Sequence, residues 1–83
     1  MMEKKNLWKK VTEICQDVFE DDELAINEAT TAADVENWDS LTHLSLIHEI
    51  ESQFKVKFTM GEIQGFQNMG ELMDTLEKRV NGR

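Results

Sequence analysis

The chain has 83 residues, a net charge of −8 and a single cysteine, Cys15. A chain of this length forms one small domain with a thin core, and one cysteine cannot form an internal disulfide. No apolar run approaches the ~18 residues of a membrane span, and the N-terminus lacks the apolar stretch of a secretory signal. We therefore expect one domain over residues 1–83, monomeric and cytoplasmic, with no membrane insertion.

The charge is unevenly distributed along the chain. Between Val11 and Phe54 there are twelve acidic residues and no lysine or arginine, and the basic residues lie near the two ends and in Lys55-Val56-Lys57. An acidic field of this kind repels nucleic acid and attracts basic protein surfaces. A small protein also needs net charge to stay in solution. The charge alone therefore does not decide between a surface for basic partners and a surface that only keeps the protein soluble.

The first predicted helix carries Leu7, Val11, Ile14 and Val18 at spacings of 4, 3 and 4 residues. This spacing places them in one apolar stripe of about four turns. Cys15 lies beside the stripe, and no neighbouring residue in the sequence would lower its pKa. We therefore interpret it as a small core residue that is not a nucleophile.

A long loop is predicted from Glu20 to Asp39, rich in residues that hydrogen-bond their own backbone in turns. We expect apolar residues within the loop to attach it to the core: Leu24, Ile26 and Val35. Its acidic end, Asp34 to Asp39, does not fit a calcium-binding EF-hand, because glycine is missing at the sixth position.

The second helix is predicted from Leu41 to Phe54, with Asp39 as its N-cap. Its expected buried face consists of Leu44, Ile47, Ile50 or Glu51, and Phe54. The side chains expected in solvent are Ser45, His48, Glu49 and Ser52.

The rest of the chain predicts a connector and two further helices. Val56 and Phe58 alternate with polar residues, and we expect them to anchor an extended connector to the core, because a lone strand has no partner. Thr59-Met60-Gly61-Glu62 is a capping-box pattern that begins a short helix ending at Gly65 or Phe66, and Asn68-Met69-Gly70-Glu71 repeats it. The last helix is expected to end at Asn81-Gly82. Its inward-facing residues are Met69, Leu72, Met73, Leu76 and Val80.

The strongest candidate for function is Ser40, within Asn37-Trp38-Asp39-Ser40-Leu41. A hydroxyl at the start of a helix is accessible, and the helix dipole favours negative charge beside it, which suits a phosphate ester. The alternative is that Ser40 is only a second cap beside Asp39. In that case the protein would be a non-enzymatic helical adaptor.

The two histidines near Ser40 raise the hypotheses of a hydrolase site and of a metal site. His43 lies three residues after Ser40, so a Ser–His hydrolase is a third hypothesis, but nothing else in the sequence supports it. His43 and His48 are five residues apart, which does not suit a shared metal ion, and we expect no metal site. Trp38 is expected to attach the loop to the core; an exposed tryptophan would instead be a partner contact.

The motif Asp39-Ser40-Leu41, opening a helix after a long loop in an acidic domain of this length, resembles the acyl carrier proteins. The resemblance covers the chain from about Lys4 to Val80. It implies an all-α four-helix bundle with three main helices, one short helix and a long first loop. It further implies that Ser40 receives 4′-phosphopantetheine from coenzyme A, installed by a Mg²⁺-using phosphopantetheinyl transferase, and that the arm's thiol carries acyl groups as thioesters. The carrier itself catalyses nothing.

The same resemblance assigns roles around Ser40. Asp39 would help the transferase to recognise the site, and Leu41 would contact the arm and the docking enzymes. We expect acyl-transferring and acyl-modifying enzymes with basic surfaces to bind a face of the second helix: Thr42, Ser45, His48, Glu49 and Glu51.

The chain also departs from the fatty-acid branch of the family. Asn37 replaces a common glycine, Trp38 replaces a small residue, and Ser45 and Ser52 stand where that branch tends to place acids. Pathways for polyketides, aminoacyl units or surface-polysaccharide substituents are therefore at least as well supported as bulk fatty-acid synthesis. D-alanyl carriers share the Asp-Ser pair.

Overall fold

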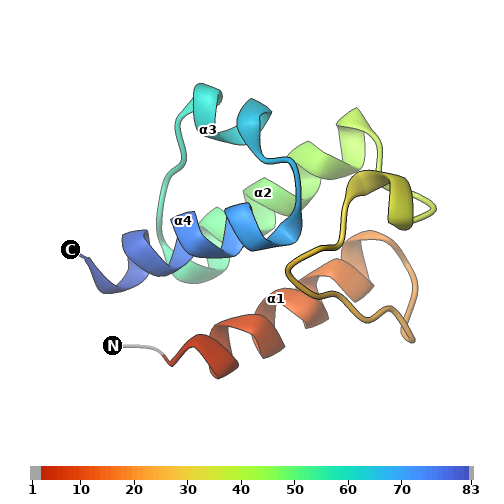
Figure 1. The fold of residues 1–83 in the computed structure, drawn as a ribbon, viewed down its shortest axis with the longest axis horizontal. Coiled ribbons are helices and arrows are strands. Elements are labelled where there is room, and N and C mark those ends of the chain that lie inside the picture. The colour runs from red at the N-terminus through yellow and green to blue at the C-terminus, as the bar shows by residue number, and fades with distance from the viewer. Residues whose placement is uncertain (1–2, 83) are drawn as a thin grey trace.

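The computed structural model describes residues 3–82, and Figure 1 shows them as helices joined by loops. No strand occurs in this range, so the predicted all-α fold with three main helices and one short helix is confirmed. The elements, in chain order, are α1 (Lys4–Val18), a 3₁₀ turn η1 (Ala32–Asp34), α2 (Ser40–Phe54), α3 (Met60–Gly65) and α4 (Met69–Asn81).

The three long helices lie side by side, and α2 and α4 run in the opposite direction to α1 (Figure 1). The start of α1 and the end of α4 consequently lie at one end of the bundle, and the start of α2 lies at the other. The short helix α3 bridges from the end of α2 to the start of α4. The molecule measures 34 × 26 × 22 Å.

The core forms where α1 and α4 turn their apolar stripes toward α2. Leu7, Val11 and Cys15 of α1 are fully buried, and α4 contributes Met69 and Leu76, also at 0% exposure. These stripes were predicted from the 3–4 spacing and are confirmed. Cys15 is 0% exposed, which confirms that it is a core residue, and burial raises the pKa of its thiol to about 12.

The predicted buried face of α2 is wrong at one position. Leu44 is 51% exposed, whereas Leu46, which the sequence did not assign to the core, is 0% exposed. Ile47 and Ile50 are buried as expected. Apolar residues occur around much of this helix, so periodicity alone does not fix its rotation, and packing against α1 and α4 selects the face centred on Ile50.

The caps that begin α2 and α3 form as predicted. Thr59 Oγ1 accepts the backbone N–H of Glu62 at 3.1 Å, and a Glu62 carboxylate oxygen accepts the N–H of Thr59 at 2.9 Å. At α4 only half of the predicted box forms: Asn68 accepts from Glu71 N–H, but the Glu71 carboxylate accepts from Gln67 instead. The chain before α4 turns so that Gln67 N–H is the nearer donor.

The long loop is attached to the core as expected. Val35 is buried, and Leu24 and Ile26 pack against the core cluster. Two backbone N–H groups at the start of α4 bond to loop carbonyls, from Met69 to Thr30 at 2.9 Å and from Gly70 to Glu28 at 3.0 Å.

Glycine suits position 70, because a Cβ there would lie 3.0 Å from the Glu28 carbonyl oxygen, which is tighter than an ordinary contact. On the other side of the bundle, Val56 and Phe58 are buried and anchor the connector, as predicted.

Candidate functional site

Ser40 is the first residue of α2, and it is exposed. The helix cap beside it is formed by two other residues: Asp39 Oδ1 accepts the N–H of Thr42 at 3.0 Å, and Thr42 Oγ1 accepts the N–H of Asp39 at 2.7 Å. No described residue hydrogen-bonds to the Ser40 hydroxyl. The hydroxyl is therefore not a cap, and it lies open to solvent at the helix N-terminus.

Two opposite charges lie at the start of α2: the carboxylate of Asp39 and the partial positive charge of the helix N-terminus. The Thr42 N–H bond holds the pKa of Asp39 below its usual range, so the carboxylate is charged at neutral pH. The N-terminus of α2 contributes a partial positive charge that favours an anion bonded to the first residue. A phosphate ester on Ser40 would be stabilised by this partial positive charge of the helix N-terminus.

Trp38 attaches the loop to the core, as predicted, and also contacts α2. Its ring packs against Phe19 with centroids 5.2 Å apart, and against the His43 ring at 6.0 Å. The indole Nε1–H donates to His43 Nδ1 at 3.1 Å. The loop end and the first turn of α2 therefore hold each other in place.

His43 is bonded through both ring nitrogens. Nε2 donates to the carbonyl oxygen of Ile63 in α3 at 2.9 Å, since a carbonyl can only accept, and Nδ1 accepts from Trp38. His43 thus joins the loop, α2 and α3, and it has no nitrogen free to activate Ser40. A Ser–His hydrolase requires a histidine nitrogen that is free to take the serine proton, so His43 cannot serve as the general base and this hypothesis is wrong.

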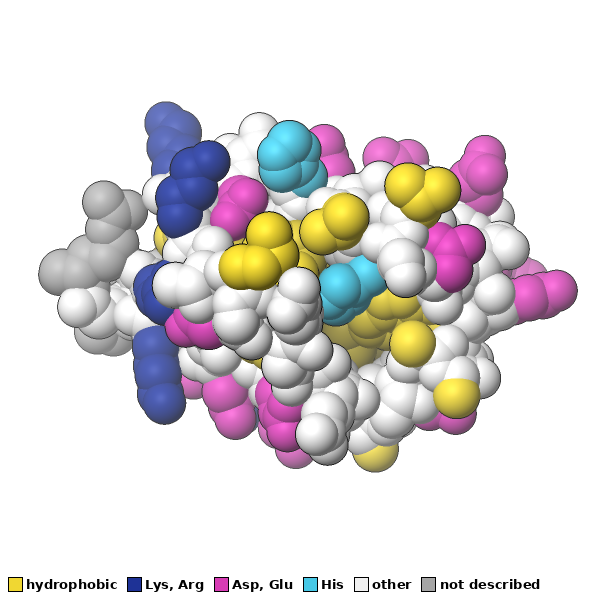
Figure 2. Space-filling model, turned by 90° about the horizontal axis from the view of Figure 1, so that it is seen from above, with side chains coloured by type: hydrophobic (Ala, Val, Ile, Leu, Met, Phe, Trp, Pro, Cys, Tyr) yellow, Lys and Arg dark blue, Asp and Glu magenta, His cyan; other side chains and the backbone are white. Residues whose placement is uncertain are grey.

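A hollow of about 320 Å³ lies directly beside Ser40. The end of the loop, the first turn of α2, α3 and the start of α4 form its walls. Figure 2 shows hydrophobic side chains exposed in this region, with a histidine among them. The lining includes Trp38, Asp39, Ser40, His43, Phe66 and Leu72.

The predicted docking residues fall into two groups. Ser45, His48 and Glu49 are exposed on α2, as expected. Thr42 and Glu51 are only half-exposed and have internal roles: Thr42 completes the cap, and a Glu51 carboxylate oxygen accepts the N–H of Phe58 at 2.8 Å. These two bonds orient the ends of α2, so the freely accessible part of the predicted face is smaller than expected.

Large apolar side chains are exposed at three positions of α2 and α3, and the sequence predicts a contact role for Leu41 alone among them. Leu41, Leu44 and Met60 are 76%, 51% and 62% exposed. Exposed large apolar side chains are typical of contact surfaces where they are neighbours, as Leu41 and Leu44 are on one helix. The signal in the sequence was the spacing of three between Leu41 and Leu44, which puts both on one side of the helix.

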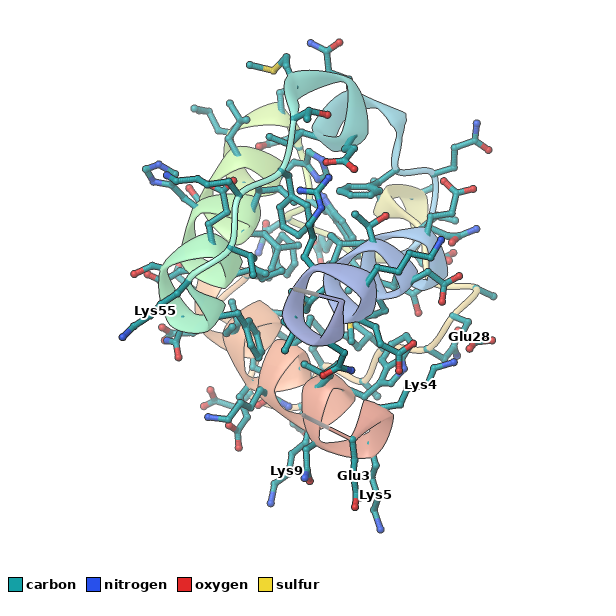
Figure 3. The ribbon with its side chains drawn as sticks, turned by 90° about the vertical axis from the view of Figure 1, so that its left-hand side faces the viewer. Glu3, Lys4, Lys5, Lys9, Glu28 and Lys55 are labelled. Carbon is teal, nitrogen blue, oxygen red and sulfur yellow. The ribbon has the colours of Figure 1, made fainter. Side chains whose placement is uncertain are left out.

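The charges separate along the long axis of the bundle. Lys4, Lys5 and Lys9 belong to the first half of α1 and Lys55 directly follows α2 (all labelled in Figure 3), so they lie toward the end of the bundle where α1 begins and α2 ends. Figure 2 shows lysine and arginine side chains gathered at that end. Acidic side chains predominate toward the other end (Figure 2), where α2 begins. Arg83 lies outside the described residues.

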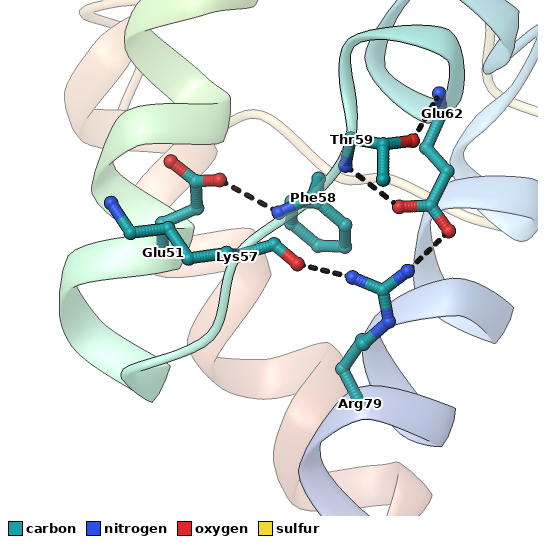
Figure 4. A network of polar contacts seen from close by, with 6 residues as sticks. All are labelled: Glu51, Lys57, Phe58, Thr59, Glu62 and Arg79. Carbon is teal, nitrogen blue, oxygen red and sulfur yellow. Dashed lines mark hydrogen bonds and ion pairs between the residues drawn. The ribbon is translucent and has the colours of Figure 1, made fainter.

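A network around Arg79 fixes α3 in place (Figure 4). The Arg79 guanidinium of α4 donates to the Glu62 carboxylate at 2.5 Å and to the carbonyl oxygen of Lys57. The Thr59 backbone N–H and the Arg79 charge together lower the pKa of Glu62. The network sets the position of α3, which carries one wall of the hollow.

Over residues 3–82, no group of three His, Cys, Asp or Glu side chains is placed to hold a metal ion. None of the helices described has both the length and the apolar character needed to cross a bilayer.

Comparisons with known proteins agree with this geometry. Residues 9–76 match the family described as "Phosphopantetheine attachment site". A solution NMR structure of a holo acyl carrier protein from Geobacter metallireducens is 38% identical, with a TM-score of 0.84, and the match covers 89% of this chain and 85% of that one. A crystal structure of an acyl carrier protein from Thermotoga maritima is 25% identical, with a TM-score of 0.83, covering 98% and 94%. No curated protein sequence matches.

Proposed function

The chain belongs to the acyl carrier protein family, in which phosphopantetheine is covalently attached, and we propose that it is a free-standing carrier modified at Ser40. The observation that carries this proposal is the open Ser40 hydroxyl at the N-terminus of α2, with capping left to Asp39 and Thr42. When attached, the arm supplies a thiol that holds acyl groups as thioesters. We further propose that the whole chain is one carrier domain acting as a cytoplasmic monomer.

The residues around Ser40 suit this attachment. The hydroxyl is exposed and needs no internal bond to be broken before it reacts. The helix dipole stabilises the phosphodiester charge, and the cap holds the first turn of α2 rigid while a transferase acts on it. Asp39 and Leu41 flank the serine and are exposed, so a transferase has access to both.

The role is non-catalytic, because family members carry groups on which other enzymes act. Both nitrogens of His43 are occupied by Trp38 and Ile63, which leaves Ser40 without a base of its own. The competing adaptor hypothesis requires Ser40 to cap α2, and its hydroxyl makes no such bond.

The proposed partners are a phosphopantetheinyl transferase and acyl-handling enzymes with basic docking surfaces. Such surfaces fit the acidic end of the molecule, where charge complementarity accelerates and orients encounter. We propose that Leu41 and Leu44, with Ser45, His48 and Glu49 beside them, are the contacts that these enzymes use. We propose that the carried group belongs to a fatty-acid, polyketide, aminoacyl or polysaccharide-modifying pathway.

The test is incubation of the protein with coenzyme A and a broad-specificity phosphopantetheinyl transferase, followed by intact mass measurement. We expect the mass to increase by one phosphopantetheinyl group. Ser40→Ala should abolish the increase, whereas Ser52→Ala, which removes an exposed hydroxyl from the same helix, should not. Unmodified wild-type protein with several transferases, or a modified Ser40→Ala variant, would contradict the proposal.

A further inference from the structure

Another hollow lies between α1 and the segment 26–28 of the long loop. Its volume is about 410 Å³, and it shares no lining residue with the hollow beside Ser40. The half-buried side chains of Trp8 and Ile26 form its apolar surface. The proposed attachment and docking residues do not include either of them, so the carrier function does not account for this hollow.

Trp8 has the properties of a contact residue. Within residues 3–82 its indole N–H has no hydrogen-bond partner, whereas the indole N–H of Trp38 bonds to His43. In the same range every buried side-chain polar atom has a partner, so the Trp8 N–H reaches solvent. A large aromatic ring that combines an apolar face with an available donor is typical of anchor residues in protein interfaces.

Two lysines border the hollow. Lys5 and Lys9 are four residues apart, which puts both on one face of α1. Figure 3 shows them pointing away from the bundle, whereas Lys4 points toward Glu28 and pairs with it at 3.5 Å. In the part of the chain that the structure describes, neither Lys5 nor Lys9 forms an ion pair. Since Lys4 offsets the charge of Glu28, the edge of the hollow has a net positive charge.

The charge and the shape of the hollow together indicate the kind of partner. Carboxylates complement Lys5 and Lys9, and a large apolar side chain would remove apolar surface of Trp8 and Ile26 from water. An anionic bilayer would satisfy only the charge, because the apolar surface is recessed. None of the exposed large hydrophobic residues described belongs to α1 or to this loop segment. The net charge of −8 also opposes adsorption to an extended anionic surface, whereas a short segment contacts only the basic edge.

We propose that this hollow is a second docking surface, which binds an acidic segment of a partner protein through one large apolar side chain flanked by carboxylates. The apolar side chain lies against Trp8 and Ile26, and the carboxylates pair with Lys5 and Lys9. Because the hollow is separate from the surroundings of Ser40, such a partner holds the chain while another enzyme acts at Ser40. The inference goes beyond the proposed carrier function and does not depend on modification of the serine.

The test is an NMR titration of the unmodified, ¹⁵N-labelled chain with short peptides, followed at the two indole N–H signals. The main probe is the end-capped peptide Asp-Glu-Leu-Glu-Asp. One control peptide replaces its leucine by serine, and another replaces all of its acidic residues by lysine. Trp8 lines the hollow and Trp38 does not, so Trp38 is the internal control.

We expect the leucine peptide to shift the Trp8 indole signal with a saturable curve and a Kd of about 1 mM, and to leave Trp38 unchanged. The serine and lysine peptides should give no saturable shift. The inference is overturned if the leucine peptide gives no shift up to about 10 mM, or if the serine peptide gives an equal one.

Two further measurements test the other possible occupants. Vesicles of phosphatidylglycerol and phosphatidylcholine should not bind the chain, and binding that shifts the Trp8 signal would assign the surface to a membrane and overturn the inference. Dilution of the protein without peptide should leave the Trp8 signal unchanged. A shift on dilution would mean that a second copy of the chain occupies the hollow, which would equally overturn it.

A matched pair of variants tests the charges. Lys9→Glu replaces an attraction by a repulsion, and with about 2.3-fold in Kd for each exposed charge contact it should weaken binding of the leucine peptide about fivefold. Lys57→Glu makes the same change in net charge at an exposed position that does not line the hollow, and should leave the Kd unchanged. Equal weakening in both variants would show that overall charge, and not the hollow, governs binding, and would contradict the proposal.

The separation of the two surfaces is tested by loading Ser40 in the presence of peptide. The rate of phosphopantetheinyl transfer should be the same with saturating leucine peptide as with an equal concentration of serine peptide. Slower transfer with the leucine peptide would place it at the Ser40 surface and overturn the inference. A chain that no transferase modifies would contradict the carrier proposal alone, because the titration of Trp8 does not require the modification.

Discussion

Two leucines of α2, only two residues apart, provide the sharpest test of how this helix packs. Leu46 is 0% exposed and Leu44 is 51% exposed. Leu→Ala has the same intrinsic effect on helix propensity at either position, because both lie in the helix interior. Any difference in stability between the two variants therefore measures burial.

The expected magnitudes follow from the exposures. Leu46→Ala removes three buried carbons, worth about 2.4 kcal/mol in transfer free energy, and a cavity term brings the loss to about 3 kcal/mol. Leu44→Ala should lose about 1 kcal/mol, because half of that side chain is already in water and no cavity forms. The difference of about 2 kcal/mol corresponds to about 8–16 °C in Tm for a domain of this size.

The assay is urea unfolding followed by circular dichroism at 222 nm, with thermal unfolding as a second measurement. With m of about 1 kcal/mol/M, the two midpoints should differ by about 2 M. The periodicity of the sequence, which puts Leu44 in the core, predicts the opposite order. Equal losses, or a larger loss for Leu44→Ala, would refute the rotation of α2 described here.

Two further predictions concern titratable groups. Cys15, with its pKa raised to about 12, should react slowly with a thiol reagent at pH 8 in the folded protein and quickly in urea; fast reaction of the native state would show that the thiol is accessible. Glu62 has a lowered pKa when folded, so its contribution is present above its unfolded pKa of about 4.3 and is lost as pH falls through the folded value. Glu62→Gln should therefore lower the urea midpoint at pH 7, and the difference from wild type should shrink toward pH 3; a constant difference would mean that the carboxylate charge is unimportant.

The start of α2 illustrates what local sequence predicts well. Asp39 was identified as the cap from residue type and position alone, and its bonds reach only three residues along the chain. The Thr59–Glu62 box has the same range. Ser40 was singled out from the motif at the helix start, and its role as attachment residue stays a prediction until the mass experiment is done.

The surroundings of Ser40 were less predictable. His43 was considered as a possible base for Ser40, but its nitrogens bond to Trp38, five residues before it, and to Ile63, twenty residues after it. Glu51 was expected on a docking face, yet it bonds to the N–H of Phe58 in the connector. Arg79 reaches back across 17 and 22 residues to Glu62 and Lys57.

The sequence by itself determined the all-helical fold, the main helix boundaries, the inward stripes of α1 and α4, and the exposed serine at the start of α2, because each depends on residues within one or two turns of one another. Only the tertiary structure decided which face of α2 is buried, where His43 and Arg79 bond, and that a hollow lies beside Ser40. Those features depend on how helices distant in sequence rotate and pack together. The apolar residues of α2 occur on several of its sides, so no local pattern fixes that rotation.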